Sequence, residues 1–204
     1  MTRPTIHIVD DEEAVRESLQ ALLAAAGFAT ATYASGRAFL AALRPTWRGC
    51  ALLDVRLPDV GGLEIQAELA RLGATLPIII VTGHADVPMA VKALKAGAVD
   101  FIQKPVDEDA LIAGIRRALA AGAKPTPAAG VEAGAGERLA QLTARERDVL
   151  HLLVIGRTNK EIARALDLSP RTVENHRARV MDKMQAESLS HLVRMAIDLG
   201  LSVG

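Results

Sequence analysis

The sequence predicts an α/β domain with a doubly wound, five-stranded parallel sheet, followed by a small all-α domain. Over residues 1–120, short β-branched runs alternate with segments of helical spacing, and this alternation gives a parallel sheet with helices on both faces. The later residues show no strand pattern and several helix-start signals. The length of 204 residues is enough for two domains of roughly 100 residues each.

Apolar, β-branched runs give the five expected strands, which are residues 5–9, 29–33, 51–55, 78–82 and 99–103. Between them, apolar residues recur at helical spacing, as at Leu19 and Leu23. Three of these segments end near Gly27, Gly73 and Gly97, where a helix C-terminus favours a left-handed residue. Residues 1–120 are therefore predicted to hold five βα units.

A linker is predicted at residues 121–136, AGAKPTPAAGVEAGAG, because this stretch lacks the large apolar residues that would anchor it in a core. It separates a first domain at residues 1–120 from a second at residues 137–204. Residues 1–122 hold 12 basic and 14 acidic residues, whereas residues 123–204 hold 12 basic and 10 acidic ones. We therefore expect two domains with different partners.

Four short helices are predicted in the second domain from their capping signals. Thr143-Ala-Arg-Glu146 and Thr158-Asn-Lys-Glu161 are capping boxes, so helices start at about 144 and 159. Ser169-Pro170 combines an N-cap with proline at the first helical position, which starts a third helix. Ser188 caps a fourth helix. The result is a small all-α domain.

The composition excludes several classes of protein. The formal net charge is zero, so the whole molecule is not a polycation that would coat nucleic acid. No stretch has the roughly 18 uninterrupted apolar residues of a membrane helix, and acidic residues stand where a signal peptide would have its apolar centre. The single cysteine, Cys50, fits a reducing compartment. We expect a cytoplasmic protein with no membrane partner.

Polar side chains stand at the carboxyl ends of the predicted strands. Asp10 and Asp11 follow the first strand, Asp54 ends the third, Thr82 ends the fourth and Lys104 follows the fifth. The functional crevice of such a sheet lies beyond these strand ends, so the five side chains are expected to meet there. Asp10 or Asp11 alone could equally be a helix N-cap, but five matched positions favour a site.

The predicted cluster suits phosphoryl chemistry. Three neighbouring carboxylates repel one another unless a cation joins them, and a hard, oxygen-seeking ion such as Mg²⁺ is the natural one. An aspartate beside Mg²⁺ can act as a nucleophile on a phosphoryl group, because the metal, an ammonium and a hydroxyl share the oxygens of the transferring group. Lys104 and Thr82 would supply the ammonium and the hydroxyl.

The motifs VDDE, LDVRLP, VTGH and FIQKP resemble those of the receiver domain of two-component response regulators, and the match covers residues 4–120. The resemblance implies a flavodoxin-like receiver fold, a sensor histidine kinase as partner and a cis peptide in the LysPro pair. It also implies the role of each matched residue: Asp54 as phosphoacceptor; Asp10, Asp11, Asp54 and the Arg56 carbonyl as Mg²⁺ ligands; Thr82 and Lys104 as phosphoryl contacts; and Phe101 as the switch aromatic.

The helix predicted after Ser169 has two unlike faces. Val173, Val180 and Met184 share an apolar face. The opposite face carries Arg171, Asn175, Ala178 and Asp182, with Glu174 and Arg179 beside it. Residues 157–183 hold seven basic and four acidic residues, which by itself also fits a solvated surface. A capped helix, a short turn and a Pro-started helix with a polar outer face nevertheless indicate a helix-turn-helix, whose second helix enters the DNA major groove.

The segments LTARERDVL, NKEIA and SPRTVENHR resemble the LuxR-type DNA-binding domain, and with the receiver the whole chain resembles FixJ-type response regulators. The resemblance implies binding to double-stranded DNA. By analogy, Glu174, Asn175 and Ala178 face base edges, Arg171 and Thr172 lie at the entrance of the helix, and Lys160, Arg177, Arg179 and Lys183 contact phosphates.

Activation is expected to work through dimerisation. Phosphorylation of Asp54 would draw in Thr82, turn Phe101 inward and make a homodimer interface of residues 87–97 and the fifth strand, with Val91 and Lys95 as contacts. A phosphorylated dimer would present two DNA-binding domains to adjacent half-sites. RNA polymerase is the further partner expected of such a transcription factor.

Two other functions remain open from the residues alone. A Mg²⁺-dependent phosphohydrolase would also use an aspartate such as Asp54, but Arg56 stands where such an enzyme has a second acid, and the sequence has no substrate-cap insertion. A DNA-binding or docking module that needs no phosphorylation would keep the same pocket. We expect no enzyme activity beyond self-catalysed phosphotransfer to Asp54 and hydrolysis from it.

Overall fold

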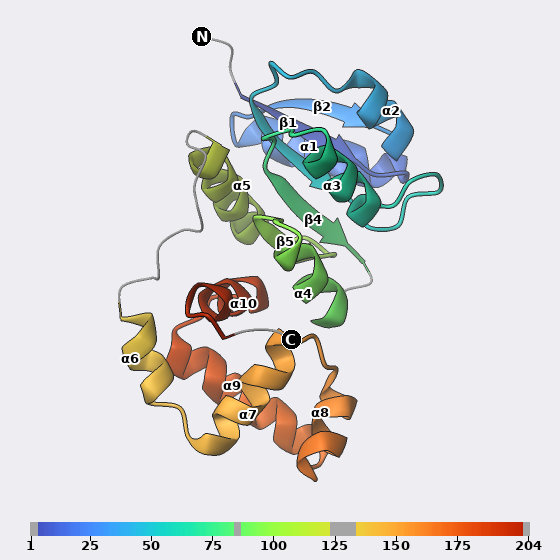
Figure 1. Cartoon of the computed structure of the whole chain (residues 1–204). Coiled ribbons are helices and arrows are strands. Elements are labelled where there is room, and N and C mark those ends of the chain that lie inside the picture. The colour runs from blue at the N-terminus through green and yellow to red at the C-terminus, as the bar shows by residue number, and fades with distance from the viewer. Residues whose placement is uncertain (1–3, 84–86, 123–133, 202–204) are drawn as a thin grey trace. The chain divides into compact units, whose positions relative to one another are not determined.

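The computed structural model describes residues 4–83, 87–122 and 134–201 (Figure 1). They belong to two compact units, one of residues 1–85 and 95–125 and the other of residues 86–94 and 126–204. The first unit contains a sheet and the second contains only helices among its described residues. The predicted fold class is therefore confirmed.

The strands are β1 (Thr5–Val9), β2 (Ala29–Tyr33), β3 (Gly49–Leu53), β4 (Ile78–Thr82) and β5 (Asp100–Gln103). All pairs are parallel, and the order is β2-β1-β3-β4-β5. Non-consecutive neighbours such as β1 and β3 require helical crossovers, which give the doubly wound arrangement. This topology leaves the carboxyl ends of all five strands at one edge.

Two predicted strands had the wrong bounds. The third starts at Gly49 and ends at Leu53, instead of spanning 51–55, and the fifth starts at Asp100, one residue late. Gly49 was missed because glycine is a poor strand former, but here it has φ 136° and a Cβ would lie 1.8 Å from the Thr5 carbonyl oxygen. Only glycine can pair with β1 at this point. Asp54 therefore lies just beyond β3.

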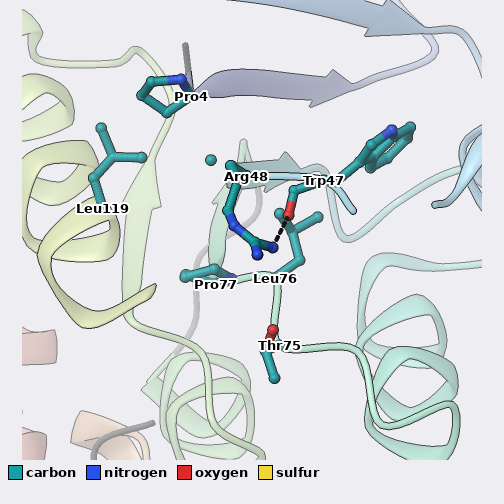
Figure 2. Close-up of a pocket in the computed structure, with 8 residues that line it drawn as sticks. Pro4, Trp47, Arg48, Thr75, Leu76, Pro77 and Leu119 are labelled. Atoms are coloured by element: carbon teal, nitrogen blue, oxygen red, sulfur yellow. Dashed lines mark hydrogen bonds between the residues drawn. The ribbon is translucent and has the colours of Figure 1, made fainter. Parts of the chain in front are cut away.

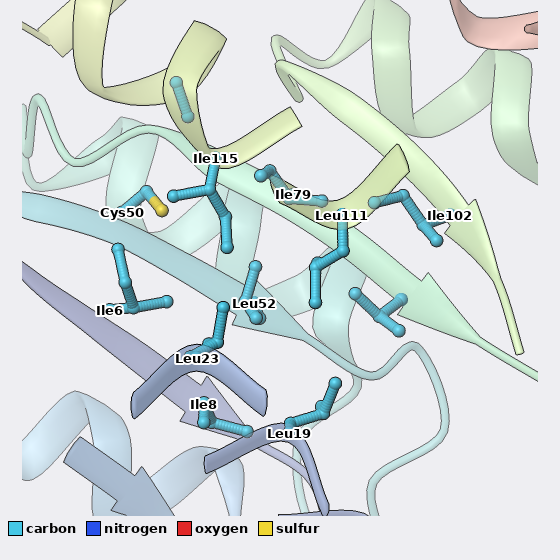
Figure 3. Packing of buried hydrophobic residues seen from close by; sticks show 12 residues of the cluster. Ile6, Ile8, Leu19, Leu23, Cys50, Leu52, Ile79, Ile102, Leu111 and Ile115 are labelled. Carbon is cyan, nitrogen blue, oxygen red and sulfur yellow. The ribbon is translucent and has the colours of Figure 1, made fainter. Parts of the chain in front are cut away.

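One face of the sheet is covered by α1 (Glu13–Ala25) and α5 (Glu108–Gly122). Leu19 and Leu23 of α1 and Leu111 and Ile115 of α5 are buried in one cluster with strand side chains (Figure 3). The strand members of that cluster are Ile6, Ile8, Cys50, Leu52, Ile79, Val81 and Ile102. Burial of this apolar surface is the main force that holds the strands in place.

The opposite face carries α2 (Gly36–Ala42) and α3 (Gly62–Arg71), while α4 (Val87–Lys95) connects β4 to β5. His7, which alternates with Ile6 and Ile8 on β1, faces Phe39 of α2 at a ring-centroid distance of 6.3 Å. The predicted helix ends at Gly27, Gly73 and Gly97 are confirmed, since each has a positive φ.

Besides residues 87–94 of α4, the second unit contains α6 (Ala135–Ala140), α7 (Ala144–Val154), α8 (Asn159–Leu166), α9 (Pro170–Met184) and α10 (Leu189–Asp198). The four predicted starts are confirmed, because Thr143, Thr158, Ser169 and Ser188 each accept a bond from the third amide of the helix. Helix α6 was not predicted. Its Ala- and Gly-rich start has the composition of a linker, yet Ala135 is buried against α9 and α10.

Both ends of the predicted linker at 121–136 are helical, because α5 extends to Gly122 and α6 begins at Ala135. Its middle, residues 123–133, lies outside the described residues, so the linker and the domain bounds around it stay a prediction. Within the described part of the chain, no helix combines the length and the apolar character needed to cross a membrane.

Candidate functional site

Three carboxylates meet at the carboxyl edge of the sheet, as predicted. Asp10 and Asp11 follow β1, and Asp54 follows β3. One oxygen from each lies within 4.8 Å of the others. Asp10 and Asp54 are buried, whereas Asp11 is exposed. An acidic cluster of this kind can hold a hard divalent cation with one open side.

Lys104 is part of this cluster. Its Nζ donates to Asp10 Oδ2 at 2.7 Å and to Asp54 Oδ2 at 2.5 Å. Burial raises the pKa of Asp10, and the bond from Lys104 partly offsets that rise. Burial acts to lower the pKa of Lys104, but its bonds to the two carboxylates outweigh this and raise it. The ammonium thus neutralises charge that the carboxylates would otherwise hold unpaired.

Thr82 and Phe101 lie on the two neighbouring strands. Thr82 is the last residue of β4 and is buried, and its carbonyl oxygen accepts from the Lys104 amide at 2.9 Å. Phe101 is half-buried within β5. The Lys104–Pro105 peptide is cis, as the resemblance implied. The predicted pocket residues are therefore brought to one edge of the sheet, although their roles in phosphorylation stay predictions.

Backbone contacts hold the carboxylates in place. The Glu12 amide donates to Asp10 Oδ1 at 3.0 Å, and the Arg56 amide donates to Asp54 Oδ1 at 2.9 Å. Arg56 lies in the loop after β3, with its side chain exposed. At Gly62 a Cβ would lie 2.4 Å from the Asp54 carbonyl oxygen. The start of α3 can approach the site this closely only because residue 62 is glycine.

Two supporting residues escaped the sequence analysis. Arg16 of α1 donates through Nη1 to the carbonyl oxygens of both Asp10 and Asp11, each at 2.8 Å. Asp59, in the loop after Asp54, accepts from the amides of Gly36 and Arg37 at 3.0 and 2.9 Å, and these bonds lower its pKa to about 2. Asp59 bonds a segment 22 to 23 positions away, and Arg16 bonds main-chain oxygens, which every residue type offers, so composition and spacing gave no signal for either.

A pocket of about 170 Å³ lies at the other end of the sheet (Figure 2). Pro4 precedes β1, Gly49 starts β3 and Pro77 precedes β4, so its walls come from the amino ends of the strands. Its one charged lining side chain, Arg48, donates to the neighbouring carbonyl of Trp47. The pocket lacks the reactive groups found at the carboxyl edge, and it is not the candidate site.

The predicted DNA-reading face lies on α9. Val173, Val180 and Met184 are fully buried, and they pack on α7, α8 and α10. The exposed residues of α9 include Arg171, Glu174, Asn175, Ala178 and Arg179, and Thr172 is half-exposed. Helix α8 precedes α9 by a short turn, in the order of a helix-turn-helix.

The four predicted phosphate contacts differ in their surroundings. Lys160 in the first turn of α8 and Arg179 of α9 are exposed. Arg177 is half-buried and donates to Asn159 Oδ1 at 2.7 Å. Lys183 donates to Glu146 Oε2 at 2.7 Å. The predicted dimer residues, Val91 and Lys95, both lie on α4. Lys95 is exposed, but Val91 is only 2% exposed and packs in a buried cluster with Leu94 and Val193, so of the two only Lys95 offers a surface to a partner in this structure.

Models of two known protein families match two successive parts of the chain. Residues 6–116 match the response regulator receiver domain, and residues 140–196 match the luxR family of bacterial regulatory proteins. The chain therefore belongs to the two-component response regulators that join a receiver domain to a LuxR-type DNA-binding domain. Within that class it is of the FixJ type, as its full-length relatives show.

Two of these relatives are transcriptional regulatory proteins FixJ. The protein of Rhizobium meliloti is 50% identical, with 97% of each chain covered, and that of Azorhizobium caulinodans is 48% identical over 97% of this chain and 93% of its own. The crystal structure of full-length FixJ from B. japonicum matches with a TM-score of 0.56 and 45% identity over 100% of each chain. The response regulator StyR matches with a TM-score of 0.58 and 38% identity, over 96% of this chain and 99% of its own.

Proposed function

We propose that this transcriptional regulator is switched by phosphorylation of Asp54, with Mg²⁺ as the cofactor and a sensor histidine kinase as the phosphodonor. The observation that carries the proposal is the contact of Lys104 Nζ with both Asp10 and Asp54 at the carboxyl edge of the sheet. A nucleophile, an acidic pair and a cation are thus gathered in one place, on a chain that also has a DNA-binding domain.

The residues present fit Mg²⁺. Three carboxylates within 4.8 Å form an oxygen-only donor set, which Mg²⁺ prefers over softer ligands. Asp10, Asp11, Asp54 and the Arg56 carbonyl would hold the ion. When bound, it neutralises negative charge on the phosphoryl oxygens. The exposed position of Asp11 leaves one side of the cluster open to solvent and to the donor.

In the transfer step, an oxygen of the ionised Asp54 side chain attacks the phosphorus of a phosphohistidine. A P–O bond forms, the P–N bond breaks, and the imidazole leaves with the electron pair of that bond. Asp54 becomes an acyl phosphate. Lys104, which now bonds Asp54, would contact a phosphoryl oxygen, and Thr82 would donate its hydroxyl to another. In the later hydrolysis, water attacks the phosphorus, the bond between the phosphorus and the Asp54 oxygen breaks, and inorganic phosphate leaves, which returns the Asp54 carboxylate.

We propose that the phosphoryl group shifts the receiver from an inactive to an active conformation. Thr82 moves toward the phosphoryl group, Phe101 turns inward, and the surface of α4 and β5 becomes the homodimer interface, with Lys95 as a contact. Val91, which is buried with Leu94 and Val193, would join it only after leaving that cluster. Phosphorylation can shift this equilibrium only if the phosphoryl group binds the active state better than the inactive one. The dimer then delivers two DNA-binding domains together.

The α9 face supports a model of DNA recognition in the major groove. Asn175 can pair with adenine, Glu174 can accept from cytosine, and Ala178 can contact a thymine methyl group. Arg171 and Thr172 would lie where the helix enters the groove. Lys160 and Arg179, both exposed, would contact phosphates. A promoter-bound dimer would also meet RNA polymerase, its expected protein partner.

The test is phosphorylation with acetyl phosphate and Mg²⁺, measured by intact-protein mass. The wild-type chain should gain one phosphoryl group, and Asp54→Ala should gain none. Asp11→Ala should still be phosphorylated at high Mg²⁺ but should need more of the ion, because it loses one exposed ligand. Undiminished incorporation in Asp54→Ala would contradict the proposal, and turnover of a small phosphoester would favour a phosphohydrolase instead.

A further inference from the structure

Two basic side chains of α9 are bonded to neighbouring helices of the same unit. Arg177 Nη1 donates to Asn159 Oδ1 at 2.7 Å, and Lys183 Nζ donates to Glu146 Oε2 at 2.7 Å. Asn159 is the first residue of α8, and Glu146 is the third residue of α7. Helix α9 is therefore tied to the N-terminal turns of both helices that precede it.

The surroundings of Arg177 differ from those of a surface phosphate contact. Its guanidinium is partly withdrawn from solvent, and this burial lowers its pKa, while the nearby Glu174 carboxylate acts in the opposite direction. Arg171 and Arg179, on the same helix, are exposed. To contact a phosphate, this guanidinium would have to break its bond to the Asn159 amide or share itself between the two acceptors, and either cost would offset part of what the new contact contributes.

Asn159 links this bond to the DNA-facing surface. Asn159 stands directly before Lys160 in the first turn of α8. Thr158 and Glu161 form the capping box of this turn. Arg177 in turn lies on α9 between the exposed residues Asn175 and Ala178. The bond therefore fixes the base-reading helix relative to the turn that carries the proposed phosphate contact.

We propose that Arg177 is a positioning residue that sets DNA sequence specificity, acting through Asn159 rather than by contacting a phosphate. This inference rests on the proposed DNA-binding function of the domain. Base-edge contacts require side chains to be held within a fraction of an ångström, whereas phosphate contacts tolerate small shifts. Loosening α8 from α9 should therefore damage discrimination between sequences more than general affinity.

The first experiment compares two duplexes with the full-length protein, acetyl phosphate and Mg²⁺. One duplex is selected by the wild-type protein from a random-sequence pool, and the other is an unrelated duplex of equal length. The ratio of the two affinities measures specificity. Arg177→Gln and Asn159→Ala should each lower this ratio about five- to tenfold, the order of magnitude of one lost hydrogen bond. The double variant should lose little more, because both changes break the same bond.

The second experiment separates positioning from phosphate contact by the salt dependence of binding. Arg177→Gln should keep the wild-type slope of log affinity against log salt. The control Lys160→Ala should lower the magnitude of that slope by about 0.9, the effect of one lost phosphate contact. The inference would be overturned if Arg177→Gln reduced the slope by a similar amount and Asn159→Ala left the affinity ratio of the two duplexes unchanged.

A conservative variant of Asn159 distinguishes loss of the bond to Arg177 from general damage to the fold. Asn159→Asp keeps an oxygen acceptor for Arg177 and should retain most of the wild-type affinity ratio, while thermal unfolding checks that the variants are folded. Loss of the ratio in Asn159→Asp equal to that in Asn159→Ala would contradict the inference. If the wild-type protein selects no duplex, the proposed DNA-binding function fails, whereas wild-type selection with unchanged ratios in the variants refutes only the role of Arg177.

Discussion

The Nζ of Lys104 lies 2.5 Å from Oδ2 of Asp54, although the two residues are 50 positions apart in the chain. The ammonium group of Lys104 thus bonds one carboxylate oxygen of Asp54, the proposed phosphoacceptor, and it bonds Asp10 as well. Any metal ion that enters the cluster meets this positive charge. Lys104 and Mg²⁺ are therefore expected to compete for the same carboxylates, although both are proposed to take part in phosphorylation.

Replacing Lys104 by Met should strengthen Mg²⁺ binding and slow phosphorylation. A unit positive charge and a divalent cation about 4 Å apart repel by about 2 kcal/mol when water screens them well, so the affinity for Mg²⁺ should rise about thirtyfold. Calorimetric titration of the metal measures this, with Lys92→Met on α4 as a control of equal charge change. Weaker Mg²⁺ binding in Lys104→Met would show that the ammonium supports the metal site instead of competing with it.

His7 should make the receiver less stable as the pH falls from about 6.5 to about 4. Burial lowers the pKa of His7 from 6.5 to about 4, so in this window the unfolded chain binds a proton that the folded chain does not. Stability is then fully present above pH 6.5 and is lost below it. At pH 5 the loss attributable to His7 is about 2 kcal/mol.

His7→Phe tests this effect, because the variant keeps an aromatic ring and removes the titration. The ring of His7 stacks on Trp47 at a centroid distance of 3.8 Å, and Trp47 is the only tryptophan in the chain. Urea unfolding followed by its fluorescence therefore reports on the receiver. Wild type should lose about 2 kcal/mol more than His7→Phe between pH 7 and pH 5. Equal losses in the two proteins would refute the role of His7.

Phosphorylation should shift the protein toward a dimer, and Lys95→Glu should oppose that shift. Lys95 is an exposed residue at the end of α4, so reversing its charge should disturb a symmetric interface without disturbing a core. Sedimentation with and without acetyl phosphate measures the effect, and Arg37→Glu, at an exposed residue of α2, is a surface control with the same charge change. A phosphorylated wild-type protein that stays monomeric at micromolar concentration would rule out the dimer model.

Asn175→Ala and Lys160→Ala should have different effects on DNA binding. Loss of a bidentate base contact at Asn175 should cost about 1–3 kcal/mol and relax the preference at one base pair. Loss of Lys160 should weaken binding to all sequences and reduce the salt slope by about one unit. Affinities for a selected site and its single-base variants, measured at several salt concentrations, check both. An unchanged base preference in Asn175→Ala would contradict the assignment of α9 as the reading helix.

Local signals predicted most of the fold. Capping residues such as Thr158 and Ser169 fixed helix starts to the residue, because a cap is a contact between neighbours in sequence. Gly49 and helix α6 were missed for the opposite reason. Gly49 enters a strand because of its close approach to Thr5, and α6 is held by apolar contacts with α9 and α10. Both depend on packing that composition does not record.

The same distinction applies to the site. Asp10, Asp54 and Lys104 could be predicted because the carboxyl ends of parallel strands must meet at one edge. Arg16, by contrast, acts through bonds to main-chain oxygens, which any residue type offers. Analogy with the LuxR-type family placed Arg177 and Lys183 among the phosphate contacts, but it could not show that each has an acceptor on another helix.

The most direct test of the account is the affinity of the full-length protein for its selected duplex, with and without acetyl phosphate, in wild type and Asp54→Asn. Asn has nearly the shape of Asp but cannot accept a phosphoryl group. Phosphodonor should raise the wild-type affinity by at least about tenfold, the gain expected when two linked domains bind together, and it should leave Asp54→Asn unchanged. Equal affinity of the wild-type protein with and without phosphodonor, or an equal rise in Asp54→Asn, would contradict the claim that phosphorylation of Asp54 controls DNA binding.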